Sequence, residues 1–158
     1  MIEVPITEDM IIKAKRMADG MGVLKASIMQ GKGNLYGFLG ELIYLEACGG
    51  KHLNTYDYDI VMDDGTKVDV KTKKTSAVPK PHYDASISNH NLKQACDIYG
   101  FCRVKDDLSV GWVLGNKSKV SFFDGARFVK RGEYDPSNGF KARSDHWSMP
   151  IKELDQVS

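Results

Sequence analysis

The sequence predicts a mixed α/β fold, of the α+β kind with a mixed sheet, in a single domain spanning residues 1–158. Three observations support this. Apolar residues recur with helical periodicity over residues 35–48, short β-branched segments alternate with turn residues after position 50, and 158 residues is the length of one ordinary domain. A hydrophobic fraction of 42% and a charged fraction of 27% argue against a disordered chain.

Two helices are expected in the N-terminal third. Thr7 is a good N-cap, acidic residues follow it, and an apolar pattern continues until Gly20. A second helix is expected over residues 35–48, where a Gly-Gly pair ends it. Gly37 and Gly40 inside this helix each cost roughly 1 kcal/mol relative to alanine. They indicate that the helix lies close against a sheet or leaves room for a substrate.

Most of the remaining chain is expected to form strands. The expected strands cover residues 51–54, 56–62, 66–73, 83–88, 97–104, 109–114 and 147–151, the last of them at the edge of a sheet. Asn89 is expected to cap a short helix that runs to Gln94, and a further helix is expected near residues 117–123. Residues 134–139 read as a loop.

The turn at residues 63–65 can join its two strands in either of two registers. A two-residue loop would place Ile60 opposite Asp69 and mix apolar with charged side chains on both faces. A three-residue loop that ends in a left-handed glycine places Ile60 opposite Val68 and gives one continuous apolar face. Because a one-residue slip reverses every side chain, the pattern favours the second register. That register places Asp59 directly opposite Asp69.

Two carboxylates in this arrangement indicate a cation site. Facing residues have β-carbons about 4.5–5.5 Å apart, so Asp59 and Asp69 would repel each other unless a cation compensates. Oxygen ligands favour a hard ion, Mg²⁺, with Mn²⁺ as a substitute. Lys71 lies on the same side and could steady a phosphate or help to activate water. Charged residues are also common on the exposed face of a hairpin, and Asp-x-Lys alone is a weak signal.

Three segments together resemble the PD-(D/E)XK, or restriction-endonuclease-like, nuclease superfamily, and its small phage-encoded members in particular. The segments are Gly37-Phe38-Leu39-Gly40-Glu41, Tyr58-Asp59-Ile60 and Val68-Asp69-Val70-Lys71-Thr72. The similarity extends over residues 34–154 and includes 111–115 and 147–151, although only the helix and hairpin motifs are chemically informative. It implies a restriction-endonuclease-like αβββαβ core with an N-terminal helical extension. Tyr58 stands where the motif has proline.

The resemblance also implies roles for individual residues. Asp59 and Asp69 match the two motif acids, Lys71 matches the motif lysine, and Glu41 matches the helix-borne acid of many members. These four are the expected catalytic residues. The expected Mg²⁺ ligands are Glu41, Asp59, Asp69 and the main-chain carbonyl of Val70.

The implied function is metal-dependent hydrolysis of phosphodiester bonds in DNA by an endo- or exodeoxyribonuclease. A homodimer fits this function, since a single site of this kind cuts one strand. The resemblance does not fix the substrate, and two alternatives remain open. The first is a catalytically inactive nucleic-acid-binding protein on the same fold, and the second is a small interaction protein whose acids face solvent.

Five more residues are candidates for contact with nucleic acid: Lys73, Lys74, Lys80, His90 and Gln94. The lysines would contact phosphates, which adds affinity without sequence specificity. A net charge of +1 neither demands nor forbids such a partner. Histidines 52, 82 and 146 have no partner at metal-ligand spacing, so surface roles are expected for them. The following aromatic residues are expected to pack in the core or at its edge: Tyr83, Phe101, Trp112, Phe122, Phe123 and Trp147.

We expect a cytoplasmic protein, in the host cytoplasm if it is phage-encoded. The first nine residues lack the basic region and long apolar run of a secretion signal, and no stretch approaches the ~18 apolar residues of a membrane span. Cys48, Cys96 and Cys102 lie outside any CxxC spacing, which argues against a structural zinc site and indicates reduced thiols. Two of the three are expected in buried segments.

Overall fold

The computed structural model describes residues 1–21 and 32–157. Its helices are α1 (Glu8–Met21), α2 (Lys32–Cys48) and α3 (Lys119–Gly125), with 3-10 turns η1 (Asn89–Asn91) and η2 (Ile151–Glu153). Its strands are β1 (Ile2–Pro5), β2 (Lys51–His52), β3 (Ile60–Val61), β4 (Lys67–Thr75), β5 (Asp84–Ser88), β6 (Ile98–Lys105), β7 (Val110–Ser118), β8 (Arg127–Val129) and β9 (His146–Pro150).

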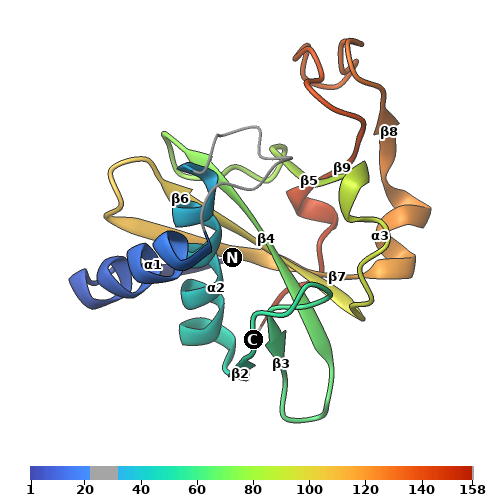
Figure 1. Cartoon of the computed structure of the whole chain (residues 1–158). Helices are drawn as coiled ribbons and strands as arrows, with labels where there is room; N and C mark the ends of the chain where they lie inside the picture. Colours follow the sequence, from blue (N-terminus) through green and yellow to red (C-terminus); the bar gives the residue numbers. More distant parts are fainter. Residues whose placement is uncertain (22–31, 158) are drawn as a thin grey trace.

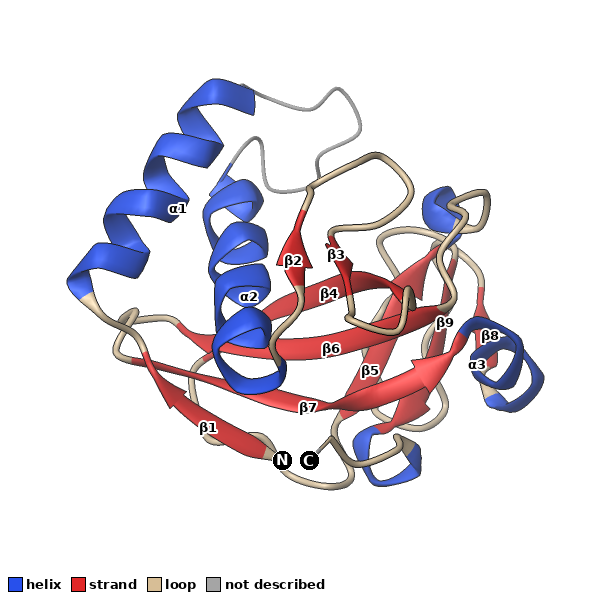
Figure 2. Cartoon of the chain, turned by 90° about the horizontal axis from the view of Figure 1, so that it is seen from below, coloured by secondary structure: helices blue, strands red, loops and turns tan. Residues whose placement is uncertain are grey.

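A six-stranded mixed sheet with strand order β1-β7-β6-β4-β3-β2 forms the centre of the molecule (Figure 1). Strands β4 and β6 are parallel, and all the other neighbouring pairs are antiparallel. Helices α1 and α2 lie together on one face of this sheet (Figure 2). A second, three-stranded sheet has the order β5-β9-β8. The predicted mixed α/β fold class is confirmed.

Each face of the large sheet has its own hydrophobic core. Val68 and Val70 of β4 pack with Leu39 and Ile43 of α2 on one face. On the other face, residues of β6 and β7 pack with α3 and with the small sheet. The six aromatic residues expected in the core or at its edge all belong to this second core, three buried and three partly buried. Side chains that alternate along a strand point to opposite faces, so β4 contributes to both sides.

The predicted register of the hairpin is confirmed. Ile60 pairs with Val68 across the antiparallel strands β3 and β4. Gly65 has φ +88°, in the left-handed region, and its N–H donates to the carbonyl of Met62 at 2.9 Å. These are the features of a three-residue turn that ends in a left-handed glycine.

Strand β3 is shorter than the expected strand over residues 56–62. The chain before it turns back on itself, because Leu53 N–H donates to the carbonyl of Asp59 at 2.8 Å and Thr55 N–H donates to the carbonyl of Tyr58 at 2.8 Å. These hydrogen bonds form a loop around Asp59. Asp59 therefore lies in the loop directly before β3 and not in the middle of a strand.

Three other expectations need correction. The segment at residues 147–151 is not an edge strand, because β9 lies between β5 and β8. The helix expected over residues 89–94 is only the 3-10 turn η1, and Ser88 rather than Asn89 caps it. Strands β1 and β8 were not expected at all, since four- and three-residue strands leave little alternating pattern in a sequence.

Thr7 and the cysteines lie as the sequence predicts. Thr7 caps α1 through a hydrogen bond that its Oγ1 accepts from Met10 N at 3.2 Å. All three cysteines are free thiols, with Cys96 and Cys102 buried as expected and Cys48 partly buried. Within the part of the chain that the structure describes, no helix has the length and apolar character needed to cross a membrane.

Candidate active site

Three carboxylates are buried where α2 meets the hairpin. Glu41 comes from α2, Asp59 lies just before β3, and Asp69 lies in β4. They are only 7%, 8% and 3% exposed, respectively. Acidic residues are almost never fully buried unless a partner compensates their charge. Their joint burial therefore needs a local explanation.

The three carboxylates have polar partners of different kinds among the described residues, and Glu41 and Asp59 also bond to each other. Asp59 Oδ2 accepts a hydrogen bond from the main-chain N–H of Val70 at 2.8 Å. Asp69 Oδ2 lies 2.5 Å from Lys71 Nζ, and Glu41 Oε2 lies 2.6 Å from Nε2 of His52. One lysine and one histidine thus face three acids, so the group lacks positive charge when all three acids are ionised.

Burial and repulsion between the acids raise the pKa values of two of them. Burial, with Asp69 adding repulsion, raises the pKa of Glu41 to about 8, although a hydrogen bond to Asp59 opposes the rise. Burial, followed by repulsion from Glu41 and Asp69, raises the pKa of Asp59 to about 8 as well. Near neutral pH the site therefore retains protons that ordinary carboxylates would have released.

Close contact between α2 and β4 brings Glu41 into this group. A Cβ placed on Gly40 would lie only 1.8 Å from Oγ1 of Thr72 on β4, so only glycine fits at this position. A Cβ on Gly37 would meet nothing within 4 Å. Gly40 therefore allows the close approach of α2 to the sheet, whereas the space beside Gly37 is open.

The chemistry of these donors fits a hard divalent cation. Carboxylate oxygens are the preferred ligands of Mg²⁺ and Mn²⁺, and a dication would replace the retained protons. Among residues 1–21 and 32–157, no three His, Cys, Asp or Glu side chains already stand together as a metal-binding group. Lys71 and His52 each engage one carboxylate oxygen, so metal binding requires these contacts to rearrange.

The outer edge of β4 is open beside the carboxylates. Strand β3 pairs with β4 only at Lys67 and Val68, and no described strand follows it along that edge. The carbonyl of Val68 and the N–H of Val70 both point to this edge, since each bonds to Asp59. Because alternate residues of a strand direct both main-chain groups to the same side, the carbonyl of Val70 is on this edge too. Val70 is therefore placed as the expected main-chain ligand requires.

Lys71 is anchored by a second contact. Its Nζ donates to Oε1 of Gln94 at 3.0 Å, and Nε2 of Gln94 donates to the carbonyl of Tyr56 at 2.8 Å. Lys119 also reaches the main-chain carbonyl of Gln94. Gln94, expected to contact nucleic acid, thus lies at the site and holds the lysine. Which ligand it contacts remains a prediction.

No family model matches this chain, and no curated protein matches it either.

Next to the carboxylates, a cavity of about 620 Å³ opens along β4. Lys71 belongs to both sites, and the expected phosphate contacts Lys73 and Lys74 line the cavity wall. Lys80 does not join them, because it lies with Pro79 and Pro81 at a separate hollow of about 320 Å³. His90 is exposed on η1 and is not among the residues of the cavity wall.

Several residues near the site were not predicted from the sequence. The surface role expected for His52 is wrong, because its side chain is largely buried against Glu41. Arg103 and Arg143 in the cavity wall were not expected either. Arg103 lies beside Lys73 because β4 and β6 pair in parallel, and this pairing joins positions 30 residues apart. A local sequence pattern carries no signal of that kind.

Proposed function

We propose that this protein is a divalent-metal-dependent nuclease that hydrolyses phosphodiester bonds of DNA. The observation that carries the proposal is the burial of Glu41, Asp59 and Asp69 close enough to repel one another, with Lys71 beside Asp69. Carboxylates that keep protons because they are buried and repel one another favour a dication, and a neighbouring lysine is suited to a phosphate.

The chain order around the site supports a PD-(D/E)XK type of nuclease. Helix α2 is followed by β2, β3 and β4, and β6 then pairs with β4 in parallel. This corresponds to the αβββαβ core, with one departure. Between β4 and β6 the chain forms β5 and the 3-10 turn η1 where that core has its second helix.

Each residue has a distinct role in the proposed mechanism. Glu41, Asp59, Asp69 and the carbonyl of Val70 would hold Mg²⁺, which when bound stabilises negative charge on a phosphate and lowers the pKa of water. Once a cation compensates Asp69, the Lys71 ammonium is available to bind a phosphate oxygen or to orient the attacking water.

Two further residues would keep this arrangement in place. His52 positions Glu41 through the 2.6 Å contact between its Nε2 and Oε2 of the acid. Gln94 limits the movement of Lys71 through the hydrogen bond between its Oε1 and the lysine Nζ. Hydrolysis would proceed in line, with no covalent bond between the protein and DNA.

The test is hydrolysis of single-stranded, duplex and branched DNA in the presence of Mg²⁺ or Mn²⁺. Wild-type protein should cleave at least one of these substrates, and Asp69→Asn and Lys71→Ala should each lower the rate by 100-fold or more, roughly the contribution of one charge-stabilising group. Asp63→Asn is the matched control, since Asp63 is an exposed acid in the turn of the same hairpin. It should cleave like the wild type.

Metal binding gives an independent measurement. Calorimetric titration with Mn²⁺ should show binding that Asp59→Asn and Asp69→Asn abolish and Asp63→Asn leaves intact. Wild-type protein that binds DNA but cleaves no substrate with either metal would overturn the enzyme proposal. That outcome would instead indicate the inactive nucleic-acid-binding protein considered above.

A further inference from the structure

We propose that the 620 Å³ cavity beside the carboxylates binds a phosphate monoester of nucleotide size. Its lining holds an excess of basic groups: Lys71, Lys73, Lys74, Arg103, Arg143 and His146, against the single acid Asp84. The volume lies in the range of about 300–1,000 Å³ that is usual for small-molecule sites.

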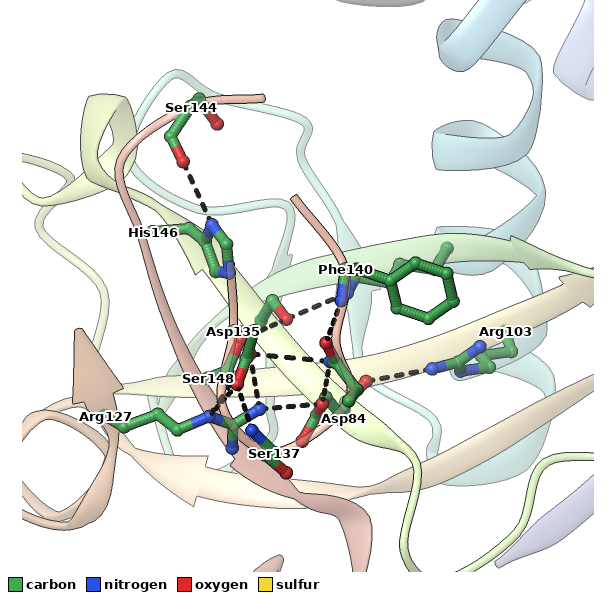
Figure 3. Close-up of polar contacts among 12 residues, drawn as sticks. Asp84, Arg103, Arg127, Asp135, Ser137, Phe140, Ser144, His146 and Ser148 are labelled. Carbon is green, nitrogen blue, oxygen red and sulfur yellow. Dashed lines mark hydrogen bonds and ion pairs between the residues drawn. The ribbon is translucent and has the colours of Figure 1, made fainter. Parts of the chain in front are cut away.

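The one acid in the lining compensates these basic groups only in part, because residues outside the lining share its charge. Asp84 Oδ2 accepts from Arg127 Nη2 at 2.8 Å and from Asn138 Nδ2 at 2.9 Å. Arg127 also binds both carboxylate oxygens of Asp135 (Figure 3). Asp84 therefore shares its negative charge with Arg127, so the cavity lining keeps a surplus of positive charge.

Two of the cavity's basic residues have only neutral partners in the described structure. Lys73 Nζ donates to Oγ of Ser86 at 2.8 Å. Arg103 Nη2 donates to the main-chain carbonyl of Asp84 at 2.9 Å (Figure 3). The guanidinium of Arg103 also lies over the ring of Tyr83 at 5.3 Å. Its Nε is buried and has no hydrogen-bond partner among the described residues and so remains a free donor. Buried donors without an acceptor are costly, which points to a ligand that supplies one.

The crowding of positive charge strengthens this conclusion. Lys73 is exposed as a residue, but loss of solvation around its ammonium, with repulsion from Arg103 and Arg127 and partial compensation by Asp84, lowers its pKa to about 8. An anion between Lys73 and Arg103 would relieve that repulsion, and the two residues are direct neighbours across β4 and β6. A phosphate monoester carries up to two negative charges and three acceptor oxygens, and a guanidinium fork matches its geometry.

The other wall residues suit the rest of a nucleotide. The side chains of Ser86, Ser88 and Asn91 offer hydroxyl and amide groups for a sugar or phosphate, and the partly buried Tyr36 offers aromatic surface for a base. Inorganic phosphate would occupy only a small part of such a cavity. We therefore assign the cavity to a nucleoside monophosphate group, either free or at the end of a nucleic-acid strand.

The position of the cavity relates it to the candidate active site, and this step rests on the proposed function. Asp69, Lys71 and Lys73 share one face of β4, because side chains alternate along a strand. Lys71 and Lys73 are thus about 7 Å apart along the chain, roughly the rise of two nucleotides in one strand of a duplex. A strand with its terminal phosphate in the cavity would lead directly to the carboxylates. The nuclease would then start from a phosphorylated end.

The test measures binding in metal-free buffer, where no hydrolysis occurs. Fluorescence anisotropy would compare labelled 12-nucleotide strands with a 5′-phosphate, a 3′-phosphate or hydroxyl ends, each with wild type, Lys73→Gln and the matched control Lys80→Gln. We expect at least one phosphorylated strand to bind 10-fold or more tightly than the hydroxyl strand. Lys73→Gln should remove that difference, and Lys80→Gln should keep it. Competition by a free nucleoside monophosphate distinguishes the two sources of the ligand.

Each outcome decides one point. If the free nucleotide binds as tightly as the strand end, the natural ligand is a free nucleotide; if only strands bind, it is a strand end. Equal affinity for all strands, without competition by the nucleotide, would overturn the proposal, as would Lys73→Gln behaving like wild type while folded by circular dichroism. End-dependent binding without any DNA hydrolysis would refute only the nuclease proposal, and hydrolysis that is indifferent to end phosphates would refute only the cavity.

Discussion

Replacing Gly40 with alanine tests whether the site depends on the close contact between α2 and β4. The added Cβ would lie 1.8 Å from Oγ1 of Thr72 and 2.8 Å from its Cβ and Cγ2. Ordinary van der Waals contact needs about 3.5 Å, so helix and strand would have to separate by more than 1 Å. Threonine cannot turn aside easily, because its branched side chain is stiff at χ1.

The cost can be worked out by comparison with Gly37→Ala. Both substitutions gain roughly 1 kcal/mol of helix propensity, and at Gly37 the new methyl group meets nothing within 4 Å. Gly40→Ala also incurs an overpacking cost, about 3 kcal/mol at the upper end of the usual range. The two variants should therefore differ by about 3 kcal/mol, or about 6–12 °C in Tm for a chain of this length.

Thermal and urea unfolding, followed by circular dichroism, would measure the difference. Gly37→Ala should unfold at or slightly above the wild-type temperature, and Gly40→Ala well below it. Gly40→Ala should also bind Mn²⁺ more weakly, because the helix that carries Glu41 has moved. Two variants within about 1 kcal/mol of each other would contradict the reasoning, since the packing cost would then be at the bottom of its range.

Two further predictions concern ionised groups. Glu41 and Asp59 hold their protons up to about pH 8 in the folded protein but release them near pH 4 when unfolded, so their contribution to stability is full below about pH 4, falls as the pH rises from about 4 to 8, and is gone above 8. Metal-free protein should melt at a lower temperature at pH 9 than at pH 6, and Glu41→Gln or Mn²⁺ should reduce that drop; a drop unchanged by either would contradict the assignment. Arg127→Gln should lower the free energy of unfolding by about 3 kcal/mol, because it leaves the buried Asp135 carboxylate without its ion pair. Urea unfolding followed by tryptophan fluorescence would check this against the exposed control Arg131→Gln, and equal midpoints would refute it.

The sequence alone predicted those features that depend on residues close together in the chain. The alternation of apolar and charged residues on both sides of Gly65 was enough to choose the register that pairs Ile60 with Val68. The same register predicted that Asp59 and Asp69 lie close together. Periodicity likewise located α2, and its glycines indicated the contact with the sheet.

Features that depend on distant pairing were not predictable in the same way. His52 meets Glu41 because the two-residue strand β2 pairs with β3, and such a short strand has no detectable pattern. Arg103 meets Lys73 only through the parallel pairing of β4 and β6. The central position of β9 depends on its neighbours β5 and β8, which bond to it from opposite sides.

The short length of β3 has a consequence for self-association. From Val70 to the end of β4, no described strand pairs with the outer edge, which could accept a strand from another molecule, as exposed sheet edges tend to do. Lys73 and Lys74 lie on this stretch, and charged lysines are a common protection against such pairing. Residues suited to bind phosphate are therefore also suited to oppose the pairing of two molecules through this edge. Neutral variants at these positions should be checked for oligomers by light scattering before any loss of binding is interpreted.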